Sequence, residues 1–387
     1  MRVRAAEAPW FVLVIAAVGL TMLTGCSGFF PPVVPVPPGS SGNYVYVANL
    51  TGTAASGTNS ATGTVTGFTV GTGTLAAVPS SPLTLGYQPL AMAVTRNNKF
   101  LYVVAQGNIN AYSINSDGSL SASSSGTGVA IVNVVSLDVS PDGQWLVALD
   151  GNTLQAQVDV FQINTTTGAL AAVSPGTLAI PNAVINPRML KFSPNGAYIF
   201  AALGTGGDAV FTFNTSTGVA IGVQKLVVSS QTSDNGLAVD KASAYLYIAR
   251  SGTGGGVRTF AIGSGGTLNE ISGSPFASGG QSYSVVVDNT GKYVYAANRA
   301  NGTIYGYTIG TGGALTALGG SPYTSGLLVT SLGTDSSGDY LLAAAFGGNA
   351  DLSMYSFDTA TPGKLDLATS TATGTAPTGA IAVALTH

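Results

Sequence analysis

Residues 186–204 read NPRMLKFSPNGAYIFAALG, and variants of this stretch recur along the chain. Two runs of alternating apolar residues flank a Ser-Pro-Asn-Gly turn, which is typical of two antiparallel strands joined by a hairpin. A repeat that is itself a strand pair favours a fold built from many similar sheets. It also raises the question whether Arg188 belongs to a functional site or only begins one strand among many.

Seven segments repeat the second half of this stretch, and most of them are rich in Tyr and Ala. They are NYVYVAN (43–49), KFLYVVA (99–105), QWLVALD (144–150), AYIFAAL (197–203), AYLYIAR (244–250), KYVYAAN (292–298) and DYLLAAA (339–345). Their first residues lie 56, 45, 53, 47, 48 and 47 positions apart. A period of about 40–50 residues is typical of the four-stranded blade of a β-propeller.

Each repeat contains further runs that predict strands. A third run with period-two alternation follows each second run, at 65–70, 109–114, 158–163, 209–214, 257–262, 303–308 and 352–357. A Gly-containing turn then leads to one weaker fourth strand, as in GTLAAV and GALTAL. No segment after residue 42 has helical periodicity, so the chain is predicted to be all-β.

First strands complete the pattern and predict how the ring closes. Six of them precede a second run, at 90–95, 135–140, 188–193, 236–240, 284–288 and 329–334. NYVYVAN (43–49) has none, whereas TGAIAVAL (378–385) lies alone near the C-terminus. We therefore expect residues 378–385 to join the N-terminal blade, which removes the open sheet edge. The prediction is a seven-bladed β-propeller with four-stranded blades over residues 43–387; a β-helix would need shorter and more regular rungs.

The N-terminus resembles the signal of a bacterial lipoprotein. Two arginines precede an apolar run over residues 10–20, which is shorter than the roughly 20 residues of a membrane span. Leu-Thr-Gly-Cys (23–26) resembles the lipobox, whose Cys is diacylated and becomes the new N-terminus. We expect residues 1–25 to be a signal peptide and Cys26 to carry the lipid that anchors an extracytoplasmic protein to the cell envelope.

The residues after the signal predict a tether. Cys26 is the only cysteine, so it forms no internal disulfide. Residues 27–42 read SGFFPPVVPVPPGSSG, and their prolines favour an extended spacer that rises about 3.1 Å per residue. We interpret residues 26–42 as the lipidated Cys and a Pro-rich linker. Ser27 in place of an Asp favours the outer membrane or the surface over retention at the inner membrane.

Composition excludes several kinds of function. Charged residues make up 7% of the chain, against roughly 25% in typical globular proteins, and 45% of the residues are hydrophobic. The net charge is −3 and no Lys/Arg-rich run is present, so nucleic-acid binding is not expected. No His/Cys metal cluster, nucleophile elbow or phosphate-cradling loop occurs, and we expect no cofactor and no metal.

The repeat as a whole resembles a known family. Ser-Pro-Asp/Asn-Gly followed by alternating aromatic and apolar residues resembles the YVTN-type propellers and, more closely, the lactonase family of seven-bladed propellers named for 6-phosphogluconolactonase. The resemblance covers about residues 43–387. It implies the propeller fold and raises lactone hydrolysis as an activity, although one fold hosts many functions.

The resemblance also implies where functional residues would lie. Pro187 and Arg188 match the family's pattern. The positions of the family's other polar residues fall on Met189 (a His), Gly204 (a Glu), Val135 (a second His) and Tyr283 (a second Arg). Arg188 is therefore the one member of the polar set that this alignment keeps.

Residue counts support this reading. The only histidine is His387, and the only glutamate after the signal is Glu270, which is predicted on an outer strand. Lactone hydrolysis requires a base and donors for the developing oxyanion. We expect a ligand- or partner-binding or scaffold module without the family's His/Glu set. The alternative is a lactone hydrolase of the 6-phosphogluconolactonase type, a carboxylic ester hydrolase of carbohydrate metabolism.

Propeller topology places the starts of first strands and the ends of second strands on one face. Arg188, Arg250, Arg299 and Asp150 are predicted there, whereas Arg96 lies in a turn on the opposite face. An arginine cluster can bind a phosphate or carboxylate bidentately, so these residues are candidate ligands for a small anionic molecule or for a protein or cell-surface partner. The alternative is that they are solvated loop residues on separate blades.

Overall fold

The computed structural model describes residues 42–51, 62–123, 128–131, 133–180, 184–229, 231–347, 350–373 and 380–387. The predicted signal peptide, Cys26 and the linker up to residue 41 lie outside these residues. Within the described ranges, no helix is long and apolar enough to cross a membrane.

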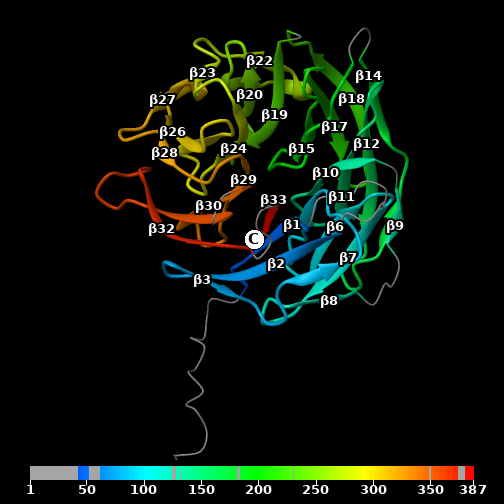
Figure 1. The fold of residues 1–387 in the computed structure, drawn as a ribbon. Coiled ribbons are helices and arrows are strands. Elements are labelled where there is room, and N and C mark those ends of the chain that lie inside the picture. Colours follow the sequence, from blue (N-terminus) through cyan, green and yellow to red (C-terminus); the bar gives the residue numbers. More distant parts are fainter. Residues whose placement is uncertain are drawn as a thin grey trace, which may run out of the picture. The chain divides into compact units, whose positions relative to one another are not determined.

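Seven antiparallel sheets follow one another around a ring, as predicted (Figure 1). Blade 1 contains β33 (Ala380–Leu385), β1 (Tyr44–Thr51), β2 (Thr62–Gly71), β3 (Thr74–Ala77) and β4 (Leu83–Leu85). Blade 2 contains β5 (Met92–Val94), β6 (Phe100–Ala105), β7 (Asn108–Ile114), β8 (Leu120–Ala122) and β9 (Val129–Ala130). Blade 3 contains β10 (Val134–Val139), β11 (Trp145–Asp150), β12 (Gln155–Ile163), β13 (Leu170–Ala172) and β14 (Gly176–Ala179).

The second half of the ring repeats this order. Blade 4 contains β15 (Met189–Phe192), β16 (Tyr198–Ala202), β17 (Asp208–Asn214) and β18 (Val219–Leu226). Blade 5 contains β19 (Thr232–Val239), β20 (Tyr245–Gly252), β21 (Gly256–Ile262), β22 (Leu268–Glu270) and β23 (Phe276–Ala277), with a 3₁₀ turn η1 (Ser264–Gly266). Blade 6 contains β24 (Ser282–Val287), β25 (Tyr293–Asn298), β26 (Thr303–Ile309), β27 (Leu315–Ala317) and β28 (Tyr323–Thr324), with η2 (Thr311–Gly313). Blade 7 contains β29 (Val329–Thr334), β30 (Tyr340–Ala345), β31 (Leu352–Phe357) and β32 (Leu365–Thr371).

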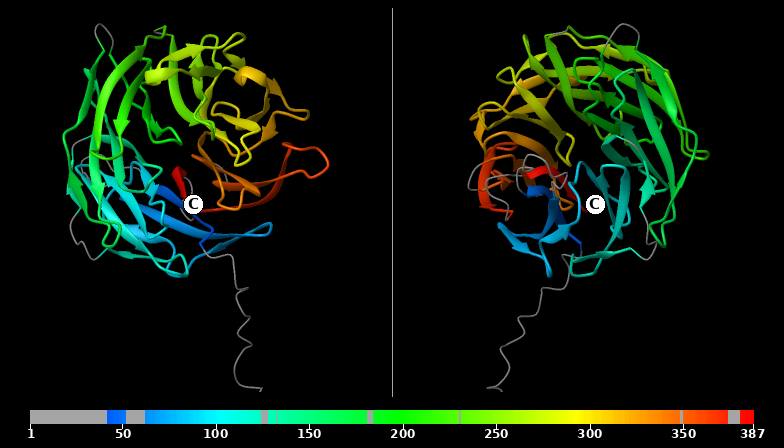
Figure 2. Two further views of the ribbon diagram at one scale, coloured as in Figure 1. Left: turned by 180° about the vertical axis from the view of Figure 1, so that it is seen from behind. Right: turned by 45° about the vertical axis from the view of Figure 1, so that its right-hand side comes forward.

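The C-terminal strand closes the ring, and this prediction is confirmed. β33 pairs antiparallel with β1, with Val383 opposite Val47 (Figure 2). The Tyr44 N–H also donates to Thr386 Oγ1 at 2.8 Å, beyond the end of β33. The two ends of the propeller are thus held in one sheet, which leaves no open edge between first and last blades.

The predicted fourth strand is only partly correct. In blades 4 and 7 a single strand, β18 or β32, forms the outer edge. In the other five blades two short strands replace it, and both pair with the third strand, as β3 and β4 do with β2. In blade 1 Pro79 and Pro82 lie between the two pieces. A proline has no N–H to give to the ladder, so the strand is interrupted there.

Neighbouring blades are joined by tyrosines of the second strands. Tyr46, Tyr102 and Tyr295 are completely buried, and their hydroxyls donate to the carbonyls of Gly118, Gly168 and Gly363 at 2.8, 2.9 and 2.6 Å. Each acceptor lies in an outer turn of the next blade. The recurring Tyr in the sequence repeat therefore has a structural role in every one of these junctions.

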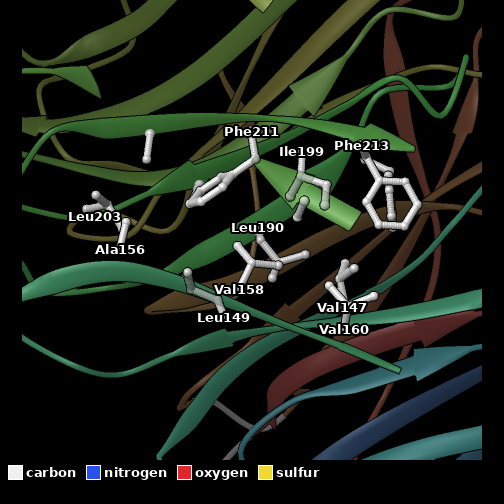
Figure 3. Close-up of a cluster of buried hydrophobic side chains, with 14 of the residues drawn as sticks. Val147, Leu149, Ala156, Val158, Val160, Leu190, Ile199, Leu203, Phe211 and Phe213 are labelled. Carbon is white, nitrogen blue, oxygen red and sulfur yellow. The ribbon is translucent and has the colours of Figure 1, made fainter. Parts of the chain in front are cut away.

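Apolar side chains fill the space between blades. Figure 3 shows the cluster between blades 3 and 4, where Leu149 and Val158 of one sheet face Leu190 and Phe211 of the next. These residues are on alternate positions of their strands, as the period-two pattern requires. The packing of successive sheets fixes where each first strand meets the centre of the ring.

Two faces of the ring have different loops. The hairpin face carries the turns from first to second strands, at 95–99, 140–144, 193–197, 240–244, 288–292 and 335–339. Asn43 joins this face through a hydrogen bond from Nδ2 to Asp335 Oδ2 (2.8 Å), and His387 joins it through Asn98. The loop face lies at the other ends of the same strands and includes residues 86–91, 151–154, 184–188, 299–302 and 325–328.

Candidate anion-binding site at the channel mouth

The first strands of all seven blades line a central cavity of about 740 Å³. Its lining includes Arg188 at the loop face and Arg96 and His387 at the hairpin face, so the cavity extends along the strands from one face toward the other. Most of the lining between these ends is aliphatic. A ligand that entered the cavity would therefore depend on the few charged groups for its orientation.

Arg188 is placed by the start of β15. Its backbone N–H donates to the Ala202 carbonyl at 2.9 Å, next to the pair formed by Met189 and Ala202. The side chain is exposed, and no acidic group of the described chain pairs with it. A guanidinium with unused donors at a cavity wall is able to bind an oxyanion.

The other two cations of the described lining are occupied. Arg96 Nη2 donates to the Val139 carbonyl at 3.1 Å, and Nη1 lies 3.1 Å from His387 Nδ1. Lys191 Nζ lies 3.4 Å from Asp138 Oδ1, and Asp138 also accepts the Phe192 N–H at 2.8 Å. Arg188 is therefore the cation of this lining whose donors are most available to a ligand.

Arg299 lies close to the cavity without lining it. Its Cζ is 4.5 Å from the centre of the Tyr283 ring, and Tyr283 is part of the lining. The Arg299 Nε is buried and has no hydrogen-bond partner among the described residues. The cation–π contact holds the guanidinium against the outer side of the wall, where it adds positive charge to the mouth.

Arg250 and Asp150 are not brought into the cavity. Arg250 donates to both carboxylate oxygens of Asp234, from Nε at 2.6 Å and from Nη2 at 2.7 Å, so its charge is used inside the fold. Asp150 accepts the Asn152 N–H at 2.6 Å, and burial raises the pKa of its carboxyl. Of the four candidates predicted from the sequence, Arg188 is the one that reaches the lining.

A match to a protein family covers the last part of the ring. Residues 245–381 match the lactonase family of seven-bladed β-propellers. The matched segment runs from β20 of blade 5 through blades 6 and 7 to the start of β33. No curated protein matches the chain.

Solved structures share the fold along nearly the whole ring. A candidate 6-phosphogluconolactonase from Bacteroides uniformis has 20% identity and a TM-score of 0.67, and the alignment covers 88% of this chain and 99% of that one. A periplasmic gluconolactonase from Pseudomonas aeruginosa has 16% identity and a TM-score of 0.62, over 87% and 97%. A protein from Lactobacillus plantarum has 16% identity and a TM-score of 0.69, over 89% and 100%.

Four of the five positions that the lactonase resemblance assigned lie around the same cavity. Val135, Met189 and Tyr283 line it together with Arg188. Met189 instead packs across the first strands, since its Sδ accepts the Leu237 N–H at 3.3 Å. The positions thus converge, but apolar or aromatic side chains occupy three of them.

Gly204 leaves no room for the acid of the lactonase pattern. Its φ is 61°, and a Cβ there would lie 2.6 Å from the Asn186 carbonyl oxygen. Its backbone pairs with Asp234 of blade 5. A glutamate at this position would need the loop to move.

Sequence reasoning missed a charge cluster between blades 4 and 5 of this seven-bladed propeller. Arg258 on β21 binds Glu270 on β22 (Nη2–Oε2, 2.7 Å), Asp234 on β19 (Nη1–Oδ2, 3.2 Å) and Asp208 on β17 (Nη1–Oδ2, 3.4 Å). The signal in the sequence was an arginine inside the apolar third run VRTFAI (257–262). Glu270 lies on an outer strand, as predicted, where it serves as a structural partner of Arg258.

Proposed function

We propose that this chain is an extracytoplasmic, lipid-anchored lactonase-family propeller that binds a small anionic ligand and does not catalyse the family's reaction. The observation that carries the proposal is Arg188, an exposed guanidinium in the cavity wall with no acidic partner in the described chain. A carboxylate or phosphate is the complementary group for such a guanidinium.

The absence of suitable bases near Arg188 supports binding over catalysis. Among the described lining residues, the possible bases are Asp138, Asp335 and His387, and His387 lies beside Arg96 at the hairpin face, at the other end of the cavity from Arg188. Asp138 is bound by Lys191 and the Phe192 N–H, and Asp335 is fully buried and accepts the Tyr340 N–H at 2.7 Å. A general base must reach the water or hydroxyl that it activates, and both carboxylates are already used in the structure.

This proposal is tested by thermal shift and calorimetry on residues 42–387. The ligands are 6-phosphogluconate, gluconate, phosphate and uncharged glucose. We expect the anions to bind and glucose to be inactive. Arg188→Ala should weaken anion binding by roughly 10–100-fold, the effect of losing one charged hydrogen-bonding group. Lys99→Ala, an exposed cation on the hairpin face, is the matched control. Equal affinity of both variants would contradict the proposal.

The lipid anchor is supported by sequence alone. Leu-Thr-Gly-Cys (23–26) follows a short apolar run, and Cys26 is the only cysteine. Expression in a bacterial host with Cys26→Ser should move the protein from the membrane fraction to the soluble extracytoplasmic fraction. Continued membrane retention of an uncleaved precursor would leave the anchor proposal without support.

A second candidate function is lactone hydrolysis outside the cytoplasm. The solved neighbour from Pseudomonas aeruginosa is a periplasmic gluconolactonase, so this fold and that compartment do occur together. Residues 42–387 and the Arg188→Ala variant should be assayed on a panel of sugar lactones. Turnover above the spontaneous rate that collapses in the variant would establish the hydrolase and overturn the binding-only proposal.

A further inference from the structure

Exposed aliphatic side chains gather on one face of the propeller. Ten large apolar residues of the described chain are exposed, among them Leu154 (80%), Val184 (76%) and Val227 (72%). Six of the ten lie in loops at the loop face: Leu90, Leu154, Val184, Val227, Leu327 and Leu328. The remaining four, Val219, Ile221, Val223 and Leu367, lie on the outermost strands β18 and β32.

Backbone contacts confirm that these loops share one face. The Leu90 N–H donates to Val104 at the end of β6, and the Thr205 hydroxyl, beyond the end of β16, donates to the Val184 carbonyl. The Phe346 N–H, just beyond β30, donates to the Leu328 carbonyl. All of these partners lie at or beyond the ends of second strands, which is the side of the cavity where Arg188 lies.

Leu328 has an unusual backbone for its side chain. Its φ is 56°, a conformation that favours glycine, yet the residue is a leucine whose side chain is 40% exposed. Neither burial nor backbone preference explains a leucine at this position. An apolar side chain held outward at some conformational cost is a feature that functional surfaces often show.

The hairpin face has the opposite character. In its six turns, no large apolar residue of the described chain is exposed, and charged side chains of both signs reach the surface: Asp142, Asp339, Lys99, Lys241 and Lys292. The exposed aliphatic residues are therefore distributed unevenly between the two ends of the same strands. A random scatter of exposed aliphatics would place some of them on both faces.

Among the described residues, negative charge is nearly absent from the surface of the loop face. The acidic residues described at this end of the inner three strands are Asp150, Asp208, Asp234 and Asp351, and the last three are buried. Asp150 is half-buried. Arg188 is exposed there, and Arg299 lies against Tyr283 of blade 6 at the same face, so the charge that the described residues present on this face is mainly positive.

We propose that the loop face docks on the surface of a lipid membrane that contains anionic headgroups, with the six aliphatic side chains entering the headgroup region and Arg188 meeting a lipid phosphate. The proposal rests on the extracytoplasmic, membrane-associated location proposed above. Burial of apolar side chains and attraction between arginine and anionic lipid are the two terms that drive such binding.

The arrangement fits a lipid surface better than a protein partner. The six side chains stand on five loops around a cavity mouth and include no aromatic residue, whereas protein interfaces have a packed core that is rich in aromatic residues. A fluid bilayer accommodates separate apolar side chains. A second copy of the chain, face to face, would bring two Arg188 side chains toward one centre, which like charges oppose.

The described domain begins on the face opposite to the loop face. Gly42, the first described residue, lies beside Asn98 on the hairpin face. A lipid anchor at Cys26 keeps the domain near a membrane, and an extended linker of about 3.1 Å per residue permits either face to turn toward it.

Flotation of residues 42–387 with vesicles tests the proposal without the anchor. This segment contains all seven blades and the closing strand, so it folds as a unit. Vesicles of phosphatidylcholine with about a third phosphatidylglycerol are compared with phosphatidylcholine alone. We expect flotation with the anionic vesicles and at least about fivefold less when Leu154, Val184 and Leu327 are all changed to Ser. Arg188→Ala should lower flotation with the anionic vesicles only.

The matched control changes three exposed aliphatic residues of the outer strands to Ser: Val219 (47%), Ile221 (59%) and Leu367 (60%). Flotation of this variant should equal that of the wild type. The proposal is overturned if the wild type does not float with the vesicles or if the control variant loses flotation equally. Absence of flotation in the wild type would indicate that the loop face binds a protein partner. Anion binding by the variant with Leu154, Val184 and Leu327 changed to Ser, measured by thermal shift, separates the two proposals. If the small-anion site is real, this variant should bind the anions as the wild type does.

Discussion

The guanidinium of Arg258 lies 3.4 Å from the carboxylate of Asp208, a residue that is 1% exposed. Arg250 and Arg258 supply two positive charges to this junction, whereas Asp208, Asp234 and Glu270 supply three carboxyl groups. Asp208 Oδ1 has no hydrogen-bond partner among the described residues. Burial, and then the neighbouring Asp234, raise the pKa of Asp208 well above its usual range. A protonated Asp208 balances the cluster at two charges of each sign.

Asp208→Asn should stabilise the protein at alkaline pH. A folded Asp208 keeps a proton that the unfolded chain releases above about pH 4, so the free energy of unfolding falls as pH rises from there toward the raised pKa. Asn keeps the shape without the proton. We expect its free energy of unfolding to exceed that of the wild type by about 1–3 kcal/mol at pH 8 and the difference to shrink toward pH 4.

Denaturant unfolding at several pH values between 4 and 8.5 measures this difference. Asp142→Asn, in an exposed turn of the hairpin face, controls for the general effect of removing a carboxylate. Parallel pH curves for Asp208→Asn and the wild type would mean that Asp208 is ionised in the folded protein.

The sequence predicted the architecture because each repeat carries its own strand periodicity and its own turn residues. The lone run at 378–385 also predicted the closure, since one blade lacked a first strand. The side-chain partners of the charged residues were beyond this reasoning. Arg250 was placed on the correct face, but its pairing with Asp234 depends on a register shift between Asp234 and Gly236 that no periodicity reveals. Topology predicts which residues lie at the mouth of the cavity, but it does not predict which partner each arginine binds.

Tyr295→Phe should weaken the junction between blades 6 and 7. The Tyr295 hydroxyl donates to the Gly363 carbonyl at 2.6 Å, and both the side chain and the bond are buried. Its removal leaves a buried carbonyl without that donor, at a cost of about 1–2 kcal/mol in the free energy of unfolding. Tyr293→Phe is the control, because Tyr293 is on the same strand and packs its ring against Gly363. Equal losses in the two variants, measured by denaturant unfolding, would assign the effect to packing.

Gly218 should tolerate a side chain far less than Gly73 does. Both have positive φ, 71° and 66°, so Ala adds a similar backbone strain at each, of about 1 kcal/mol. A Cβ at Gly218 would lie 2.3 Å from Trp145 Cζ3, whereas a Cβ at Gly73 would have no atom within 4 Å. The Trp145 indole is fixed by its own bond from Nε1 to the Thr215 carbonyl (2.7 Å) and by the edge of Phe213.

Because the indole has no room to withdraw, Gly218→Ala should destabilise the protein by about 1–3 kcal/mol more than Gly73→Ala. Thermal and denaturant unfolding of the two variants measure the difference. A Gly218→Ala protein as stable as Gly73→Ala would mean that the turn at 214–218 shifts freely. Trp145 would then contribute little to the contact between blades 3 and 4.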